Sequence, residues 1–437
     1  MADPHAKLRQ FVEELRGLPL DWRSKGFGTL GRPVSAAGLA AADVHLSDLG
    51  TPMMTIDAAA LAHNVSAMGE WSADRNLGLA PHGKTTMAPA LWLAQLDAGA
   101  CAITVANAAQ LRAGYAFGVR SFLLANELVG TAELRWLAER QDADPELNVL
   151  CWVDSPAAVD RIDAALAGSP PRRPLTVCVE VGSPRGRAGS RTPAEVVHTA
   201  ERVLASPVCS LAGISGYEGT VPGAGSDDAG LAAVGAFLRA VASAYEGLAD
   251  RFETPVVTVT AGGSAHFDLV AQLLGPLAGT RDGHTVAVVL RSGAYVVHDD
   301  VHYAKLTPST RGDGPQLHAA IHVWSQVLSR PEPGLVLLDA GKRDLPFDLG
   351  LPVLLSAVRR GWEGAAVVEL GPTEVLRLND QHAYVRVQPD SPVAVGDVVR
   401  LGLSHPCTAF DKWRTIAVVE SVDATDPLVV DAVQTFF

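Results

Sequence analysis

Short apolar runs alternate with helix-like segments from about residue 50 to residue 290 of this chain. Each run is continuously apolar, which is typical of a parallel strand buried on both faces, and amphipathic segments such as 131–140 and 230–252 separate the runs. This alternation predicts a parallel sheet with helices packed on its outer face. The eight runs are 77–81, 102–105, 121–125, 147–153, 175–181, 211–216, 256–260 and 286–290.

The number of these units predicts the architecture. Eight strand-and-helix units in about 210 residues match a closed (β/α)8 barrel, a fold that usually takes about 200–250 residues. An open, doubly wound sheet is the alternative, because it has the same alternation of strands and helices. We therefore expect an α/β protein with a TIM-like barrel.

The pattern changes after residue 300, where short alternating β-patterns are punctuated by Gly, Pro and Asp. These features predict a C-terminal antiparallel β-domain. We divide the chain into an N-terminal extension (1–50) with a strand that joins the β-domain, a barrel (51–300) and the β-domain (301–437). The extension contains one amphipathic helix candidate at 8–15, and the strand-like segment 51–57 is expected to pair back onto the β-domain.

Composition and charge narrow the class of protein. The chain has 437 residues, of which 48% are hydrophobic, and its net charge of -13 argues against nucleic acid or an anionic membrane as partner. The N-terminus lacks the apolar core of a signal peptide, and no run of 18 apolar residues occurs. Five scattered cysteines fit a reducing compartment better than a disulfide framework. We therefore expect a folded cytoplasmic protein.

A single lysine stands where the first predicted strand ends. The stretch LAPHGKTTM (79–87) passes from apolar residues through Pro81, His82 and Gly83 to Lys84. Lys84 either marks the place where the strand reaches water, as most lysines do, or is a buried amine with a lowered pKa that forms a Schiff base. In a barrel this position lies at the C-terminal face, where barrel active sites are found.

The loops after the seventh and eighth predicted strands are rich in small residues. They read AGGSAHFD (261–268) and RSGAYVVHDD (291–300). In barrels these two loops commonly bind phosphate, because small residues allow backbone N–H groups to approach phosphate oxygens. The residues suited to this role are Gly262, Gly263, Ser264, Gly293 and Ala294. A phosphate site beside a lysine that can capture an aldehyde points to pyridoxal phosphate as cofactor.

Four segments resemble those of a known family. They are TPMMTIDAAALAHNV, APHGKTTM, AGGSAHFD and SHPCTAFDKWR, and together they are similar to the D-serine dehydratase and D-threonine aldolase branch of the alanine-racemase-like, fold-type III pyridoxal phosphate enzymes. The resemblance covers about residue 50 to the C-terminus. PHGKT looks like the family's P-H-x-K-T segment, which implies that Lys84 forms the Schiff base with the cofactor.

The two glycine loops also resemble family segments. GGSAH is similar to a G-G-S/T-P phosphate loop, with Ala265 in place of the proline. SGAY is similar to P-G-T-Y, which implies that Gly293 and Tyr295 lie near the phosphate, while Ser292 and Ala294 depart from the family's residues.

Two further segments imply contacts to the cofactor ring. VEVGSPRGRAG looks like the segment of the fifth strand whose arginine faces the ring, which implies this role for Arg187. GYEGT is similar to the segment of the sixth strand that places Tyr217 beside the ring.

A second group of chemically active residues lies near the C-terminus. His405 and Cys407 are two residues apart in SHPCTAFDKWR, so in extended backbone they project to the same face, and both are good zinc ligands. On residues alone, a surface histidine beside a buried cysteine is the simpler interpretation. The resemblance implies a zinc-binding H-x-C pair, whereas the aldolase branch has H-x-D and prefers other divalent ions. The sequence identifies no third protein ligand.

The resemblance implies a lyase that acts on β-hydroxy-D-amino acids. Pyridoxal phosphate acidifies the Cα–H of an amino acid, Lys84 is the natural base there, and zinc would help the β-hydroxyl to leave, giving a 2-keto acid and ammonia. A metal-dependent D-threonine aldolase, which would yield glycine and an aldehyde, is the alternative. An amino-acid racemase or a non-catalytic carrier of pyridoxal phosphate is a second alternative. The resemblance also implies a homodimer in which the partner's β-domain completes each site.

Three other residues near the motifs have open roles. His382 aligns with a family histidine and either supports the site or is an ordinary histidine of the β-domain. Lys412 and Arg414 follow the metal motif and either form a solvated face or bind a distal substrate carboxylate.

Overall fold

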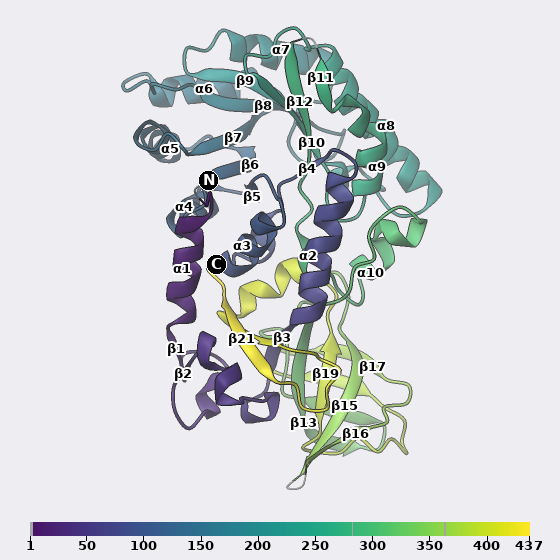
Figure 1. Ribbon diagram of the computed structural model, residues 1–437. Helices are drawn as coiled ribbons and strands as arrows, with labels where there is room; N and C mark the ends of the chain where they lie inside the picture. The colour runs from purple at the N-terminus through teal and green to yellow at the C-terminus, as the bar shows by residue number, and fades with distance from the viewer. Residues whose placement is uncertain (1–2, 282, 362–363) are drawn as a thin grey trace.

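The structure, a computed structural model, describes residues 3–281, 283–361 and 364–437. An α/β barrel lies at the top of Figure 1 and a β-domain lies below it, with helix α2 (Ala58–Ala73) running between the two. The N-terminal helix α1 (Ala6–Arg16) lies beside β21 (Val429–Gln434), so the two ends of the chain meet along one side of the molecule.

The predicted barrel is confirmed. Parallel strands follow one another in the order β5 to β10 and then β12, β4 pairs with β12, and a parallel bridge between His82 and Thr104 connects the end of β4 to β5. The short strand β11 (Gly279–Arg281) forms an antiparallel pair with β12. Within the described residues the eight predicted runs form β4 (Gly78–Leu79), β5 (Ile103–Val105), β6 (Ser121–Glu127), β7 (Asn148–Val153), β8 (Leu175–Val181), β9 (Cys209–Gly216), β10 (Val256–Ala261) and β12 (His284–Leu290).

Burial on both faces explains why these runs are continuously apolar. In β7, Val149, Cys151 and Val153 pack outward in the large core beneath the helices, while Trp152 points into the barrel. Trp152 is 1% exposed and fills the interior together with small and medium side chains such as Cys178. Because successive side chains of a strand point to opposite faces, both sets of positions must be apolar.

Helices cover the outside of the barrel and begin just after the strands. Several have polar N-caps, for example Asn107, Ser155 and Thr192, whose side chains accept a backbone N–H of the first turn. The helices are α3 (Pro89–Asp97), α4 (Ala108–Phe117), α5 (Thr131–Ala143), α6 (Pro156–Leu166), α7 (Pro193–Leu204), α8 (Asp228–Glu246) and α9 (Phe267–Leu273). Among the described helices, none combines the length and apolar character needed to cross a membrane.

The β-domain is largely antiparallel, as its sequence pattern predicts. Its central strand β13 pairs with β14, β19 and β3, and β19 also pairs with β15. The strands are β13 (Ile321–Glu332), β14 (Leu335–Leu338), β15 (Val353–Gly361), β16 (Gly364–Val368), β17 (Glu374–Leu378), β18 (Ala383–Arg386), β19 (Val398–Gly402) and β20 (Thr415–Val419), together with β21.

A strand from the N-terminal part of the chain belongs to this domain. β3 (Met53–Asp57) lies antiparallel to β13 and parallel to β20, which confirms the pairing expected for 51–57. The joining strand was expected within residues 1–50 but begins at Met53. The residues before it form a small structure of their own. There β1 (Pro19–Leu20) and β2 (Val34–Ser35) pair with each other, and Phe27 and Leu39 pack against Trp324 of β13 and its neighbours.

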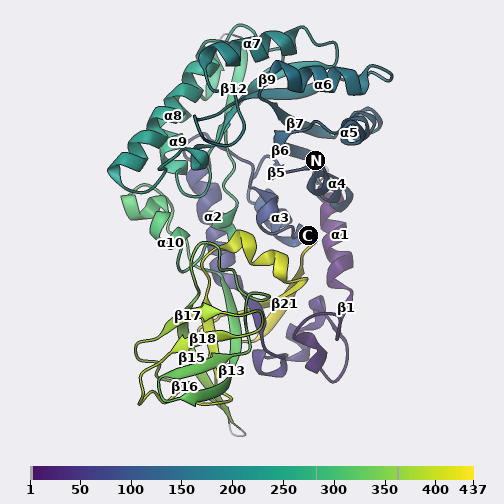
Figure 2. The same cartoon turned by 180° about the vertical axis from the view of Figure 1, so that it is seen from behind.

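Three short helical segments lie at the junction of the domains. α10 (Tyr303–Leu306) follows the eighth barrel strand, and the turns η10 (Pro406–Thr408) and η11 (Phe410–Lys412) carry the predicted metal motif. In Figures 1 and 2 the yellow turns lie between the barrel and the β-domain strands.

Asp57 links the two domains and provides a test of how they are joined. Its carboxylate accepts the Ala60 N–H at 2.8 Å, as the N-cap of α2, and the Val422 N–H at 2.9 Å. Replacing Asp57 with Ala is expected to lower the free energy of unfolding by about 2–4 kcal/mol, because two backbone donors lose their acceptor. Chemical denaturation measures the change.

Asp227→Ala is the matched control, since Asp227 caps α8 by accepting the Gly230 N–H, and this contact lies within the barrel. Loss of this exposed cap is expected to lower the free energy of unfolding by about 1 kcal/mol. Equal effects of the two variants would contradict a linking role for Asp57.

Candidate active site

A cavity of about 250 Å³ lies where the C-terminal ends of the barrel strands meet α10 and the metal motif. The structure brings most of the predicted site residues together around it. Those that line the cavity are Lys84, Arg187, Tyr217, Gly262, Gly263, Ser264, Gly293, His405 and Cys407.

Lys84 lies in the 3-10 turn η5 (Gly83–Thr85), shortly after β4. The turn is packed closely against α3, since a Cβ on Gly83 would lie 2.4 Å from the Trp92 ring, and this packing positions Lys84 at the cavity. Burial lowers the pKa of Lys84 from its usual 10.5, and the nearby Arg187 and Arg291 guanidinium groups lower it further, while the charge of Cys407 raises it. Of the two interpretations of Lys84, the structure therefore favours the partly buried amine with a lowered pKa over a lysine that marks where the strand reaches water.

His82 lies beside Lys84 and was not predicted as a site residue. Burial holds the pKa of its imidazole well below 6.5, with a smaller contribution from the Lys84 charge. Its Nδ1 has no hydrogen-bond partner among the described residues, although His82 lines the cavity. His82 therefore contributes a neutral imidazole to the wall of the cavity.

Arg187 and Tyr217 lie close to each other at the cavity. The Arg187 guanidinium carbon lies 5.4 Å from the centroid of the Tyr217 ring, and Arg187 Nη2 is 3.8 Å from Glu180 Oε1. Burial raises the pKa of Tyr217 to about 12, so its hydroxyl remains protonated at neutral pH. The Arg187 guanidinium and the Tyr217 ring are thus both available to contact the ring of the cofactor that we predict from the sequence.

The turn after β10 has the predicted small residues but uses its N–H groups within the protein. Gly262 has a φ of +98°, and its N–H and that of Gly263 are donated to the Glu218 carboxylate at 3.0 and 2.6 Å. Ser264 Oγ accepts the Ala294 N–H at 3.2 Å, which leaves the serine hydroxyl proton free to be donated. Ser264 and Ala294 both line the cavity.

The turn after β12 contributes Gly293 but not Tyr295. A Cβ on Gly293 would lie 2.6 Å from the His82 carbonyl oxygen, so no larger residue fits against the turn of Lys84. Tyr295 is 2% exposed and belongs to the core of the barrel, where its hydroxyl is hydrogen-bonded to Gln95. The structure therefore places Tyr295 behind the cavity and not among the residues that line it.

Arg291 is a further cation at the cavity. It donates to Thr260 Oγ1 at 2.7 Å and to the Gly216 carbonyl at 2.8 Å, and burial lowers the pKa of its guanidinium. It thereby ties together the ends of β9, β10 and β12.

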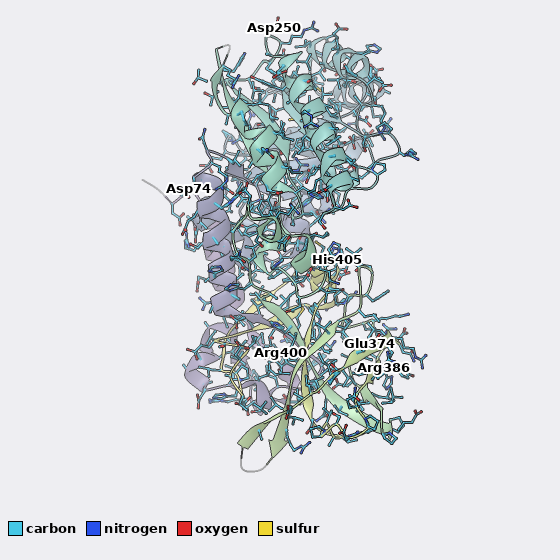
Figure 3. All side chains as sticks on the ribbon, turned by 90° about the vertical axis from the view of Figure 1, so that its right-hand side faces the viewer. Asp74, Asp250, Glu374, Arg386, Arg400 and His405 are labelled. Carbon is cyan, nitrogen blue, oxygen red and sulfur yellow. The ribbon has the colours of Figure 1, made fainter. Side chains whose placement is uncertain are left out.

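The predicted metal motif reaches the same cavity. His405 Nδ1 lies 2.8 Å from Asp348 Oδ2, and Thr408 Oγ1 donates to Asp348 Oδ1 at 2.8 Å, so the carboxylate orients the imidazole and leaves Nε2 available. Cys407 Sγ is 3.3 Å from Thr85 Oγ1, next to Lys84. Figure 3 shows His405 at the level where the barrel ends and the β-domain begins.

The donor set fits a zinc ion with two protein ligands. Burial alone would lower the pKa of His405, but its contacts with Cys407 and Asp348 outweigh burial and raise it. Tyr303 also faces the cavity, and its hydroxyl is hydrogen-bonded to Cys407. Among the described residues no group of three or more His, Cys, Asp or Glu side chains is placed to hold a metal. The remaining ligands would come from solvent or substrate.

The three residues with open roles lie outside this cavity. His382 and Arg414 are exposed, and neither lines the cavity. Lys412 Nζ lies 3.8 Å from Asp411 and 5.9 Å from the centroid of the Phe347 ring.

Four site residues were not predicted from the sequence. Three of them lie next to predicted motifs, since His82 and Glu218 are close to Lys84 and Tyr217 in sequence and Arg291 opens the loop of the eighth strand. The fourth, Asp348, lies 57 residues before His405. Local pattern gives their position but not the direction of their side chains, which tertiary packing decides.

Comparisons with known proteins agree with this arrangement. The model "Alanine racemase, N-terminal domain" matches residues 56–273, and the model "Putative serine dehydratase domain" matches residues 320–419. A D-threonine aldolase of Arthrobacter sp. is 27% identical over 378 residues, which are 86% of this chain and 90% of that protein. A 3-hydroxy-D-aspartate aldolase of Paracoccus denitrificans is 23% identical over 366 residues, 82% of this chain and 86% of that protein.

Solved structures share the fold. A D-threonine aldolase from Filomicrobium marinum has a TM-score of 0.75 at 22% identity, covering 90% of this chain and 97% of that chain. A D-threo-3-hydroxyaspartate dehydratase from Delftia sp. HT23 has a TM-score of 0.68 at 20% identity, covering 89% and 98%. An alanine racemase from Bacillus anthracis has a TM-score of 0.56 at 13% identity, covering 88% and 97%.

The two domain models and the barrel site together establish the family. The chain belongs to the alanine-racemase-like family of fold-type III pyridoxal phosphate enzymes, in the group that carries the serine dehydratase domain. The cavity fits pyridoxal phosphate, because it offers the Lys84 amine, the Ser264 hydroxyl and the cationic side chains of Arg187 and Arg291.

The role of Lys84 can be tested by trapping the cofactor. We expect pyridoxal phosphate to turn the protein yellow and borohydride to fix the reduced cofactor on Lys84, as measured by peptide mapping. Because the pKa of Lys84 lies below 10.5, attachment should persist to lower pH than labelling of an exposed lysine does. Lys84→Ala should abolish covalent attachment.

Lys305→Ala is the control, because Lys305 is an exposed lysine of α10 next to the cavity residue Tyr303. This variant should attach the cofactor as the unmodified chain does. Recovery of the reduced cofactor on any lysine other than Lys84 would refute the assignment.

Proposed function

We propose that this protein is a pyridoxal phosphate- and zinc-dependent lyase that eliminates water from β-hydroxy-D-amino acids. The observation that carries the proposal is that one cavity holds both Lys84 and the His405–Cys407 pair. The similarity to D-threonine aldolase and 3-hydroxy-D-aspartate aldolase supports the substrate class. The similarity in fold to a D-threo-3-hydroxyaspartate dehydratase is compatible with elimination.

Lys84 is the group suited to move the proton at Cα. When bound, pyridoxal phosphate supplies the electron sink that acidifies the Cα–H of an amino acid. The lowered pKa of Lys84 increases its neutral fraction at a given pH, and a neutral amine can accept that proton. Arg187 and Tyr217 would bound the space for the cofactor ring.

His405 and Cys407 are suited to act on the β-hydroxyl of the substrate. They would hold a zinc ion, or another divalent metal, which supplies Lewis acidity for loss of the β-hydroxyl. Asp348 fixes the orientation of the His405 ring through Nδ1. The thiolate of Cys407 favours zinc over the hard cations that prefer oxygen ligands.

The proposed reaction consists of the loss of water followed by hydrolysis. Cα loses a proton and Cβ loses hydroxide, so water leaves and an enamine remains. Addition of water to the corresponding imine then releases ammonia and a 2-keto acid. D-Serine would give pyruvate by this route.

Retro-aldol cleavage is the second candidate. The similarity of the chain to a D-threonine aldolase and a 3-hydroxy-D-aspartate aldolase favours it. An aldolase would remove the proton of the β-hydroxyl and break the Cα–Cβ bond, giving glycine and an aldehyde. The two reactions use the same cavity and differ in which bond breaks.

A metal-removal experiment tests the proposed reaction. Chelation is expected to stop product formation from a panel of β-hydroxy-D-amino acids, while borohydride still attaches the cofactor to Lys84, because only the departure of hydroxide requires the metal. His405→Ala and Cys407→Ala should behave in the same way. Keto acid is measured against glycine and aldehyde, and metal content is measured in parallel.

Asp348→Ala should weaken zinc binding by about 10- to 100-fold, because it removes the partner of His405 Nδ1. Asp411→Ala is the control, since Asp411 lies in the segment of His405 and Cys407 and forms an ion pair with Lys412. Undiminished elimination by metal-free protein, or absence of bound zinc, would contradict the role of the pair. Glycine and aldehyde as the only products would select the aldolase.

The proposal includes a cytoplasmic homodimer in which the partner's β-domain completes each site. The five free cysteines support a reducing compartment. Sedimentation should give twice the mass of the chain, and dilution to monomer should reduce activity. A monomer that retains full activity would count against the completed site.

A further inference from the structure

Glu218 is a buried carboxylate that contacts the turn lining the cavity. It opens the 3-10 turn η6 (Glu218–Thr220) after β9 and is fully buried. Its Oε2 accepts the Gly262 N–H at 3.0 Å, and its Oε1 accepts the Gly263 N–H at 2.6 Å. A buried carboxylate requires such donors, and it finds them in the two glycines of the turn after β10.

The same turn is held from its other side by the loop after β12. Ser292 Oγ lies within hydrogen-bond distance of the carbonyl oxygens of Gly262 and Gly263, at 3.3 and 3.1 Å, and the Arg291 N–H is donated to the Gly262 carbonyl at 3.0 Å. A Cβ on Gly263 would lie 2.8 Å from the Tyr217 ring. The peptide groups of Gly262 and Gly263 are therefore held on both sides by hydrogen bonds, and their N–H groups are donated within the protein.

The hydrogen-bond donor that remains for a ligand in the cavity is the hydroxyl of Ser264, the residue that follows Gly263. Ser264 Oγ accepts the Ala294 N–H at 3.2 Å, so its own proton can be donated to a ligand. Ser264, Gly293 and Ala294 all line the cavity, as do the cationic side chains of Lys84 and Arg291, which favour a phosphate dianion there.

We propose that Glu218 is a positioning residue for the cofactor phosphate. By holding Gly262 and Gly263, its carboxylate sets the turn that presents Ser264 beside Ala294. The phosphate is then bound by the Ser264 hydroxyl, next to Gly293, instead of by the two glycine N–H groups. The inference rests on the proposed function only in requiring that the cavity binds pyridoxal phosphate.

A competing account predicts the opposite effect of removing the charge. If the Glu218 carboxylate only replaces an absent phosphate, it competes with the cofactor for the Gly262 and Gly263 N–H groups. Glu218→Gln would then remove a rival anion, and pyridoxal phosphate would bind as tightly as before or more tightly. If Glu218 positions the turn, the amide of Gln leaves one N–H without an acceptor and binding weakens.

The experiment compares pyridoxal phosphate with pyridoxal, which lacks the phosphate. Cofactor-free protein is titrated with each compound, and binding is read from the absorbance of the attached cofactor and from borohydride trapping on Lys84. Glu218→Gln is expected to weaken binding of pyridoxal phosphate by about tenfold and to change binding of pyridoxal by less than about twofold. Ser264→Ala should show the same selective loss.

Glu253→Gln is the matched control, because Glu253 Oε2 accepts the Leu211 N–H at 2.8 Å near the opposite end of β9. This variant should bind both compounds as the unmodified chain does. Unchanged or tighter binding of pyridoxal phosphate by Glu218→Gln would overturn the inference, as would an equal loss of both compounds, which is the behaviour of a merely structural residue.

Ser264→Ala removes the hydroxyl donor and leaves the hydrogen bonds from Gly262 and Gly263 to Glu218 in place. Undiminished binding of pyridoxal phosphate by this variant would also overturn the inference. Failure of the unmodified chain to bind pyridoxal phosphate would overturn the proposed cofactor together with the inference. Binding by the unmodified chain with no selective loss in the variants would overturn the inference alone.

Discussion

The contact between Thr85 Oγ1 and Cys407 Sγ, 3.3 Å long, joins the turn that carries Lys84 to the segment that carries the metal motif. It can form only while the β-domain is held against the C-terminal face of the barrel. Two backbone hydrogen bonds hold the loop after β12 to the region of the β-domain, from Asp300 N to the Leu403 carbonyl at 3.1 Å and from Ala320 N to the Val297 carbonyl at 2.7 Å. The site therefore depends on the docking of two domains.

The electrostatics of the cavity follow from this enclosure. Lys84, Arg187 and Arg291 all line a space that is partly closed to water, so their charges act on one another and on His82. The result is an amine with a lowered pKa and a neutral imidazole, both of which are states that favour capture of an aldehyde and proton transfer. An anionic ligand such as a phosphate would offset the excess of positive charge.

His405 and Cys407 bring an imidazole and a thiol to one cavity. A thiolate beside an imidazole is a softer donor pair than an imidazole beside a carboxylate, and it favours zinc. Asp348 and Tyr303 contact the two donors, so their orientation and charge are controlled by residues outside the motif.

The sequence alone determined the architecture and the identity of the main reactive groups. Continuously apolar runs such as 175–181 indicate strands buried on both faces, because hydrophobic periodicity is a local property of the chain, and eight of them in a row favour a closed barrel over an open sheet. The segment 51–57 was likewise recognisable as a strand of the second domain. Lys84 stood out by its place at the end of the first strand, whereas His405 and Cys407 stood out through the family resemblance of their segment.

Tertiary structure alone decided how these groups face one another. Tyr295 lies behind the cavity, where it contacts Gln95, and the N–H groups of Gly262 and Gly263 are donated to Glu218 instead of pointing freely into the cavity. Asp348 reaches His405 across 57 residues of sequence. Such contacts depend on the direction of a side chain and on packing between distant segments, and neither is encoded in the local pattern of hydrophobic and polar residues.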